Sequence, residues 1–536
     1  MSEPTFILNV EALLATGVDT NKEYYYYMAT QELVWGTAGL LVLLGAGILW
    51  LVIRGARQTR SMRDYALGSV QFSPTFVALS LAASITSAAT FIINPGFIAL
   101  YGLSGVLALG IVLPIGLYIS LVVLTKSYRK YGQSVQALTM AQWIGQRYGS
   151  KGFAFFFALL SLLLITFVVL ICVGMTKVLS KALNVDELPV LLGLITFVFG
   201  YMMFGGANSM VYTNTIQAAM MILVAAILLG SGYEHFSSGV HGFLDELAAI
   251  DPNLVSATNP ESPLFRDFFE IIFCNFIVGI AIVCQPHIIT KSLLVKEDKD
   301  VNKFLLIAIL VETLFFLVVF VGLYARISFP DLTVGGEALK MDGIVSAYVV
   351  SEFPVYVGIV LILGLLAAGL STLEGLIQSI PTSISADIIE PLMGDRLGEG
   401  EARDRNLIRI NKAVIVLLAI VTAFLSYDQL LNPSLSVGIF AQNGVYAYFS
   451  AAFIPVLMGI FFKDVPRQAP TIASVVAVTV HFGIFYGRLG SYMQDPVRNP
   501  AIASAMAILV STLVGLMVLW TMHRTSTTSP ANVSTP

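Results

Sequence analysis

The segment that decides the fold is SPTFVALSLAASITSAATFIINPGFIAL, residues 73–100. It is long and apolar enough to cross a bilayer, which takes about 20 mostly apolar residues, yet its centre, 83–90, is small and polar. Near its far end stands Asn94-Pro95-Gly96, and Pro95 has no N–H to offer the carbonyl of Phe91. In hydrocarbon, a freed carbonyl is tolerated only where protein, water or an ion satisfies it. The segment therefore predicts a membrane helix interrupted at a binding site.

The composition of the whole chain agrees with a membrane protein. Of 536 residues, 57% are apolar and only 12% are charged, whereas soluble domains carry about 25% charged residues. A net charge of −4 without a basic stripe excludes a nucleic-acid-binding protein, and the hydropathy excludes disorder. Cys172, Cys274 and Cys284 lie in apolar runs and are interpreted as small buried hydrophobes. The fold class is therefore an all-α polytopic membrane protein.

Hydropathy predicts about thirteen membrane helices, and their flanking charges predict an orientation. Basic clusters after alternate segments place 21 of the 29 Lys and Arg residues on one side, which is expected to be the cytoplasm. The N-terminus then lies outside and the C-terminus lies in the cytoplasm. The predicted segments are 33–53, 73–100, 104–125, 152–182, 188–204, 214–232, 267–288, 304–325, 346–377, 412–431, 436–462, 470–487 and 500–521.

The seventh predicted helix resembles the second in one respect. It carries Gln285-Pro286-His287 near its inner end, where Pro286 would free the carbonyl of Ile282. The two proline-interrupted helices are five segments apart and run in opposite directions. Such a pair is typical of an inverted repeat with a binding site at the membrane midplane. Kinked helices that only pack against one another are the alternative.

The ninth predicted helix offers oxygen ligands for a small cation. Its segment LAAGLSTLEG, 366–375, places Ala368, Ser371 and Thr372 on one helix face. Two hydroxyls and a carbonyl there, with carbonyls of the second helix, would suit a monovalent ion, because calcium and magnesium usually recruit carboxylates. The alternative is that the hydroxyls bond back to their own helix.

At these residues the chain resembles the solute:sodium symporter family, and within it the pantothenate and proline symporters. The resemblance covers about 60–465, and its landmarks are 81–105, 137–149, 204–221, QPHIITK (285–291), FPDLTV (329–334) and LAAGLSTLEG (366–375). It implies the leucine-transporter fold with two inverted five-helix repeats, and sodium-driven uptake by alternating access. The expected parts are 1–72 (extracellular N-terminus and first flanking helix), 73–232 (first repeat), 233–462 (outside loop and second repeat) and 463–536 (two flanking helices and a short cytoplasmic tail).

The resemblance also implies functional residues. Sodium would be bound by the carbonyls of Ala83, Thr86 and Ala368 and the hydroxyls of Ser371 and Thr372. The solute pocket would be formed by Ser87, Thr90, Val278, Ile282 and Gln442.

The chain departs from the proline symporters at several of these positions. Those proteins have an aspartate where this chain has Ile85, and another where it has Asn214. Since the second acid is implicated where a second sodium binds, its loss predicts one sodium per cycle. Val278 and Ile282 stand where proline symporters have aromatic residues, which favours another solute, for example an aliphatic acid.

Two carboxylates in apolar runs are further candidates, because a charge at the midplane costs about 2.5–3.5 kcal/mol on insertion scales. Glu374 lies two residues beyond Thr372. It is a coupling candidate that would attract exiting sodium or carry a proton; the alternative is a helix-end carboxylate that reaches water or a cytoplasmic lysine. For Glu312 a structural partner is expected.

The predicted function is a sodium-coupled symporter, in the plasma membrane (a bacterial inner membrane), that imports a small organic solute such as a carboxylate, vitamin or amino acid. Sodium is the expected co-transported ion, and the protein is expected to be embedded in a lipid bilayer. Neither a nucleic acid nor an obligate protein is expected as a partner. The protein is not expected to be an enzyme, since no His/carboxylate or Ser/Lys cluster lies on a shared helix face. The sequence also lacks the phosphate-binding loop of an ATPase. The alternatives are a proton-coupled carrier that uses Glu374, and a membrane sensor or channel.

Overall fold

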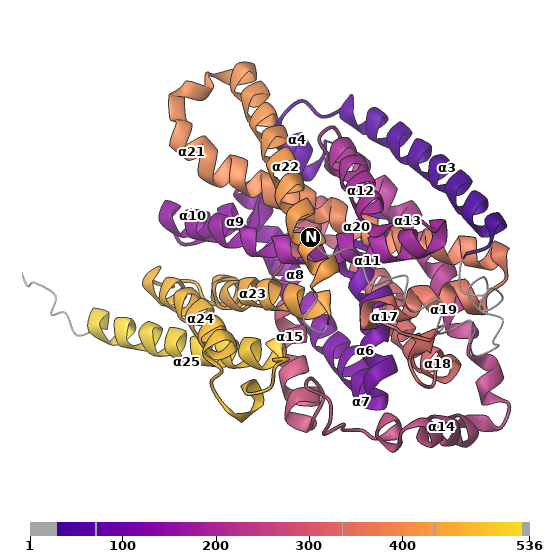
Figure 1. The fold of residues 1–536 in the computed structure, drawn as a ribbon. Coiled ribbons are helices and arrows are strands. Elements are labelled where there is room, and N and C mark those ends of the chain that lie inside the picture. Colours follow the sequence, from indigo (N-terminus) through magenta and orange to yellow (C-terminus); the bar gives the residue numbers. More distant parts are fainter. Residues whose placement is uncertain (1–28, 70–71, 335, 433–435, 528–536) are drawn as a thin grey trace, which may run out of the picture.

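The computed structural model describes residues 29–69, 72–334, 336–432 and 436–527, and these are almost entirely helical (Figure 1). One short antiparallel hairpin, β1 (Thr333–Val334) and β2 (Glu337–Ala338), pairs Thr333 with Ala338. Ten helices in the described part are long and apolar enough to cross a membrane, and two bent helix pairs raise the number to twelve. The remaining predicted segment, 188–204, is the shorter apolar helix α12 (Glu187–Met202). A polytopic helical membrane protein is confirmed.

The first half of the chain contains the first flanking helix and one of the two bent spans. Its elements are α3 (Gln31–Ala56), α4 (Met62–Leu67), α5 (Pro74–Ile85), the π-helical turn η1 (Ala89–Ile93), α6 (Asn94–Tyr101), α7 (Leu103–Gly105), η2 (Val106–Val112), α8 (Leu113–Ser134), α9 (Met140–Arg147), α10 (Lys151–Leu160), η3 (Ser161–Leu164), α11 (Ile165–Leu183), α12 and α13 (Ala207–Gly230).

The second half contains the other bent span and the last flanking helices. Its elements are η4 (Tyr233–Phe236), α14 (Gly239–Ile250), η5 (Pro252–Val255), η6 (Phe269–Cys274), α15 (Asn275–Ile282), α16 (Pro286–Ile289), η7 (Thr290–Leu294), η8 (Asp298–Asp300), α17 (Val301–Leu317), η9 (Val318–Phe320), α18 (Val321–Ser328), η10 (Met341–Gly343), α19 (Ile344–Glu352), α20 (Val355–Ser383), η11 (Ile384–Ile389), α21 (Glu390–Met393), η12 (Gly394–Leu397), α22 (Gly400–Leu431), α23 (Val437–Phe461), α24 (Gln468–Gly487), η13 (Ser491–Met493) and α25 (Pro500–Thr527).

The first bent span is broken at a different place from the one that the proline predicts. α5 and the continuous η1–α6 segment meet at 53°. The unwound residues are Thr86 and Ser87, and Thr86 is extended with φ −83° and ψ 114°. Pro95 instead lies in the first turn of α6, directly after η1. A π-helical turn pairs residues five apart, as Asn94 N does with Ala89 O, so the proline is accommodated without a break. The small, polar centre of the span is what unwinds.

The second bent span is broken where the sequence predicts. Phe269–Ile282 and Pro286–Leu294 meet at 55°. Gln285, the residue before Pro286, is extended with φ −81° and ψ 136°, as expected of a residue that precedes proline. The backbone N–H of Gln285 donates to the Ile282 carbonyl at 3.1 Å. The carbonyl that the proline would have freed therefore has a donor within a tight turn.

Two predicted segments have different boundaries in the structure. The range 346–377 crosses a break at Phe353-Pro354, and the spanning helix α20 begins at Val355. The tenth predicted helix, 412–431, begins earlier in the structure, at Gly400, which is the first residue of α22. Leu407 explains the second difference, because it packs with Met62 and Leu397 in a small apolar cluster outside the main core. This cluster gives the polar first part of α22 a buried side chain.

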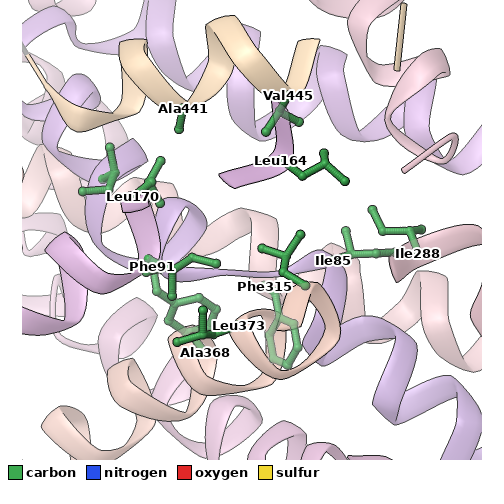
Figure 2. Packing of buried hydrophobic residues seen from close by; sticks show 14 of the residues in the cluster. Ile85, Phe91, Leu164, Leu170, Ile288, Phe315, Ala368, Leu373, Ala441 and Val445 are labelled. Carbon is green, nitrogen blue, oxygen red and sulfur yellow. The ribbon is translucent and has the colours of Figure 1, made fainter. Parts of the chain in front are cut away.

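The core lies where the bent spans cross α20 and α8. α20 packs against α5, α11 and α13, and α8 packs against α15. The second contact requires glycine on both helices, because a Cβ on Gly279 would lie 2.2 Å from the Leu113 carbonyl oxygen and one on Gly116 would lie 2.6 Å from that of Phe276. Small residues of this kind let membrane helices approach closely. Figure 2 shows the apolar side chains at the centre, including Phe91 and Phe315, whose rings meet edge to face.

The two extramembrane segments lie at opposite ends of the molecule. Figure 1 places α14, from the predicted outside loop, far from α21, which precedes the predicted cytoplasmic part of α22. Phe243 and Leu247 of α14 are buried, and the Phe243 ring packs against that of Tyr324 on α18. α14 is therefore a short helix that packs against α18.

Candidate functional site

The end of α5 and the middle of α20 bring a set of oxygen atoms together. Ser371 Oγ lies 2.6 Å from the Ala83 carbonyl oxygen and 3.1 Å from that of Ala368. Thr372 Oγ1 lies 3.1 Å from the carbonyl oxygens of Thr86 and Ser84 and 3.4 Å from that of Ala83. The structure thus unites all five oxygens that the sequence proposed as ligands, and all belong to fully buried residues.

The carbonyls converge there because α5 stops. A helix leaves its last carbonyls without intrahelical donors, and α5 ends at Ile85, before the extended Thr86. Sequence reasoning missed one oxygen of the set, the Ser84 carbonyl. Its position between two predicted ligands was the available signal. The site combines neutral oxygens without a directly facing carboxylate, which suits a monovalent cation better than a divalent one.

Clusters of metal-binding side chains do not occur elsewhere in the described ranges: no group of three or more His, Cys, Asp or Glu residues there could hold a metal ion. Carbonyl and hydroxyl oxygens are another kind of cation ligand. The oxygen set at the end of α5 offers such ligands.

Glu312 of α17 lies directly behind this oxygen set. Its Oε2 accepts a hydrogen bond from Thr86 Oγ1 at 2.8 Å, and the side chain is fully buried. Within the described part of the chain, Oε1 has no hydrogen-bond partner. The structural partner expected for Glu312 is thus Thr86, whose carbonyl belongs to the oxygen set.

Glu374 lies within α20 and is buried rather than at a helix end that reaches water. Tyr201 Oη donates to its Oε1 at 2.6 Å, and Thr213 Oγ1 donates to its Oε2 at 2.6 Å. Gln217 Nε2 adds a third bond to Oε1 at 3.2 Å. The carboxylate is therefore well supplied with donors from α12 and α13. Its role in coupling stays a prediction.

A cavity of about 100 Å³ lies beside the oxygen set, between the two broken spans and α23. Ser87, Thr90, Ile282 and Gln442, four of the five predicted pocket residues, line it. Val278 is not part of the lining; it is fully buried in α15, one turn before Ile282. Four of the five residues therefore surround one cavity, and their role in binding a solute stays a prediction.

Sequence reasoning missed three polar residues of the cavity lining: Asn94, Gln285 and Tyr446. Gln285 is the most informative of them, because its Oε1 is buried and has no partner among the described residues. Its position directly before Pro286 was a usable signal, since a broken helix turns its flanking side chains toward the gap. The lining thus offers amide and hydroxyl groups between apolar walls.

The oxygen set and the cavity share one short segment of chain. Thr86 contributes its carbonyl to the oxygens that face Thr372, and the next residue, Ser87, lines the cavity. Ser87 Oγ also accepts from the Ala89 N–H at 3.0 Å, which caps the turn that resumes the helix. Ligands in the two places would therefore contact adjacent residues of one unwound segment, an arrangement that allows the binding of one ligand to affect the other.

Comparison with known proteins agrees with this geometry. The sodium/pantothenate symporter of Escherichia coli (strain K12) is 26% identical to the chain over 489 residues, which cover 89% of this chain and 94% of the relative. The sodium/pantothenate symporter of Haemophilus influenzae is 27% identical over 397 residues, covering 72% and 78%.

A solved structure of a Na⁺-coupled sialic acid symporter, in a substrate-bound outward-open state, superposes with a TM-score of 0.71. It is 16% identical, and the match covers 90% of this chain and 97% of the other. This likeness concerns the fold, and it confirms the leucine-transporter architecture with inverted five-helix repeats. The model of the sodium:solute symporter family matches residues 65–476. The chain belongs to the sodium:solute symporter family, and it is a membrane transporter that couples the import of a solute to sodium.

Proposed function

We propose that this symporter carries one sodium ion per cycle, bound by the oxygens around Ser371 and Thr372, together with a small organic acid of the pantothenate type. The observation that carries the proposal is that the oxygen set and the cavity share the unwound segment Thr86–Ser87. Sodium that pulls on the Thr86 carbonyl fixes the position of Ser87 in the cavity. Solute held by Ser87 fixes the carbonyl in return, so each ligand raises the affinity for the other by the same factor.

The chemistry of the cavity supports a solute that alternates polar and aliphatic groups. Its polar lining consists of amides and hydroxyls, and the rest is aliphatic or aromatic, with Leu109, Leu113 and Phe167 among the walls. Pantothenate has hydroxyls, an amide, a dimethyl carbon and a carboxylate, which match these groups. The two relatives named as sodium/pantothenate symporters support the same class.

A carboxylate on the solute needs a positive charge, and the cavity lining contains no Lys or Arg within the described residues. The sodium ion itself would be the nearest cation, separated from the cavity only by the Thr86–Ser87 backbone. This would make binding of an anionic solute depend on sodium. Because one sodium ion and one singly charged acid carry no net charge together, the driving force would come from the sodium concentration gradient and not from the membrane potential.

The proposed orientation places the N-terminus outside and the C-terminus in the cytoplasm. Support comes from the distribution of basic residues, and from the separation of α14 and α21 at opposite ends of the molecule (Figure 1). With this orientation α5 and η7 form the cytoplasmic halves of the two broken spans. The plasma membrane is the proposed location.

The proposal is tested with purified protein in liposomes, by uptake of radiolabelled pantothenate under an imposed sodium gradient at constant pH. Uptake should require sodium, and Thr372→Ala should abolish most of it at low sodium. Uptake driven equally well by a proton gradient without sodium would favour the proton-coupled alternative. Sodium flux without any solute requirement would favour a channel.

The solute class is tested separately, by thermal stability with a panel of small acids and amino acids, each with sodium or with potassium. Pantothenate or a close analogue should stabilise the protein only with sodium. If an unrelated solute stabilises the protein only with sodium, the proposed solute class is wrong, but the proposed coupling to sodium stands.

A further inference from the structure

Glu374 and a buried lysine face each other across one amide side chain. Lys291 lies on η7, just after the second break, and only 3% of it is exposed. Its Nζ donates to the Ser80 carbonyl at 2.9 Å and to Ser80 Oγ at 2.7 Å, both on α5. An ammonium group has three protons to donate, so these contacts leave one for a further acceptor.

The third acceptor is Asn214 of α13, which is fully buried. Which of the two terminal atoms of an Asn side chain is oxygen and which is nitrogen is assigned from the neighbouring groups. For Asn214, one of the two orientations gives both atoms hydrogen-bond partners. In it, Oδ1 accepts from Lys291 Nζ at 3.0 Å, and Nδ2 donates to Glu374 Oε2 at 3.1 Å. Ammonium, amide and carboxylate then form a continuous chain from η7 through α13 to α20.

This chain is electrically balanced by the protein's own residues. A buried charge is strongly unfavourable unless an opposite charge and hydrogen bonds compensate it. The Glu374 carboxylate accepts hydrogen bonds from Tyr201, Thr213 and Gln217. The positive charge of Lys291 lies on the other side of the Asn214 amide. It needs no transported cation for its charge to be neutralised.

We propose that Lys291 is a built-in counter-ion of Glu374, relayed by Asn214, which keeps this carboxylate from binding a second transported cation and so limits the transporter to one sodium. Lys291 acts here as a positioning residue, because it touches neither the oxygen set nor the cavity. The inference rests on the proposed function, since it concerns the number of sodium ions carried by that same transporter.

The same contacts have a second consequence. Lys291 belongs to the half-helix that follows the second break, and Ser80 belongs to the half-helix that precedes the first. The ammonium thus ties together the two half-helices that lie on the predicted cytoplasmic side. The Lys291 ammonium, which balances the charge of Glu374, therefore also fixes the position of these two half-helices relative to each other.

The decisive experiment compares four proteins: the wild type, Lys291→Met, Glu374→Gln and the double variant. Equilibrium binding of radioactive sodium to purified protein, at saturating solute, gives the number of ions. We expect one ion for the wild type and the double variant, and two for Lys291→Met, because only there is the Glu374 charge uncompensated. One ion bound to Lys291→Met would overturn the proposal. Lys291→Arg, which keeps the charge, is the matched control and should bind one.

Melting temperatures of the same four proteins in sodium-free buffer separate this inference from the proposed function. Removing one partner of a buried pair is more damaging than removing both, so the double variant should melt above either single variant. Losses that simply add in the double variant would overturn the pairing of Lys291 with Glu374. Absence of sodium binding to the wild type would instead overturn the proposed function, while the melting comparison would still decide on the pair.

Discussion

Thr86 donates its side-chain hydroxyl to Glu312 at 2.8 Å while its carbonyl faces Thr372 at 3.1 Å. One residue thus links a buried carboxylate to the oxygen set at which sodium is expected. The hydrogen bond from the hydroxyl fixes the orientation of the unwound Thr86, and with it the position of the Thr86 carbonyl. Glu312 is therefore expected to contribute to sodium affinity without contacting the ion.

The first prediction concerns Glu312→Ala. The substitution leaves the buried Thr86 hydroxyl without its acceptor, which costs about 1–3 kcal/mol, and this loss should appear as a sodium half-saturation constant raised roughly tenfold or more. Glu312→Gln, which keeps an acceptor, should have a smaller effect. Sodium dependence of uptake measures both. The exposed Glu352, at the end of α19, provides the control variant Glu352→Ala; equal effects in the two alanine variants would contradict the assignment.

The second prediction concerns the hydroxyl of Thr372, which lies within 3.4 Å of three carbonyl oxygens. Thr372→Ala removes one ligand and should raise the sodium half-saturation constant at least tenfold, or about 1.4 kcal/mol, whereas Thr372→Ser should stay close to the wild type. Solute uptake measured as a function of sodium distinguishes them. Ser379, on the same helix, donates to the Leu376 carbonyl of α20 and not to the oxygen set, so Ser379→Ala should leave sodium dependence unchanged.

Much of the fold could be predicted from the sequence because hydropathy, proline and glycine act locally. The span lengths and the break before Pro286 follow from these signals. The position of the first break did not, since Pro95 was absorbed by the π-helical turn η1. That turn is packed against α17 through Phe91 and Phe315, and such a tertiary contact is not readable from one segment. The boundaries of the repeats stay predictions.

In the candidate site, too, some features could be predicted from the sequence and others could not. The hydroxyl pair Ser371 and Thr372 was recognisable because two small polar residues in an apolar helix need partners, and the structure supplies carbonyls from α5. The side chains that face the cavity were harder to predict. A bend of 55° turns Gln285 toward the cavity and leaves Val278 packed away from it. Helical periodicity alone cannot show which side chains a bend exposes.

The third prediction concerns Gln285, whose buried Oε1 lacks a partner among the described residues and is available to a solute donor. Gln285→Leu should raise the KM for solute by roughly two- to tenfold, since one hydrogen bond contributes about 0.5–1.5 kcal/mol, while sodium half-saturation at saturating solute stays near the wild-type value. Uptake over a matrix of solute and sodium concentrations tests this. Gln58 is exposed, so Gln58→Leu is the control. A shift in sodium dependence alone would show that Gln285 serves the ion and not the solute.

The fourth prediction concerns Asp342 in η10, outside the membrane spans, which accepts from Ser436 Oγ at 2.5 Å and from the Val437 N–H at 3.0 Å at the start of α23. Burial raises its pKa above the ordinary 3.8, against the lowering effect of these two hydrogen bonds. Between 3.8 and the raised pKa the folded protein holds a proton that the unfolded chain has released, so stability falls as pH rises across that window. The melting temperature of Asp342→Asn should lack this fall, whereas the exposed-site control Asp331→Asn should keep it. Parallel curves for Asp342→Asn and the wild type would mean that Asp342 does not titrate in this window.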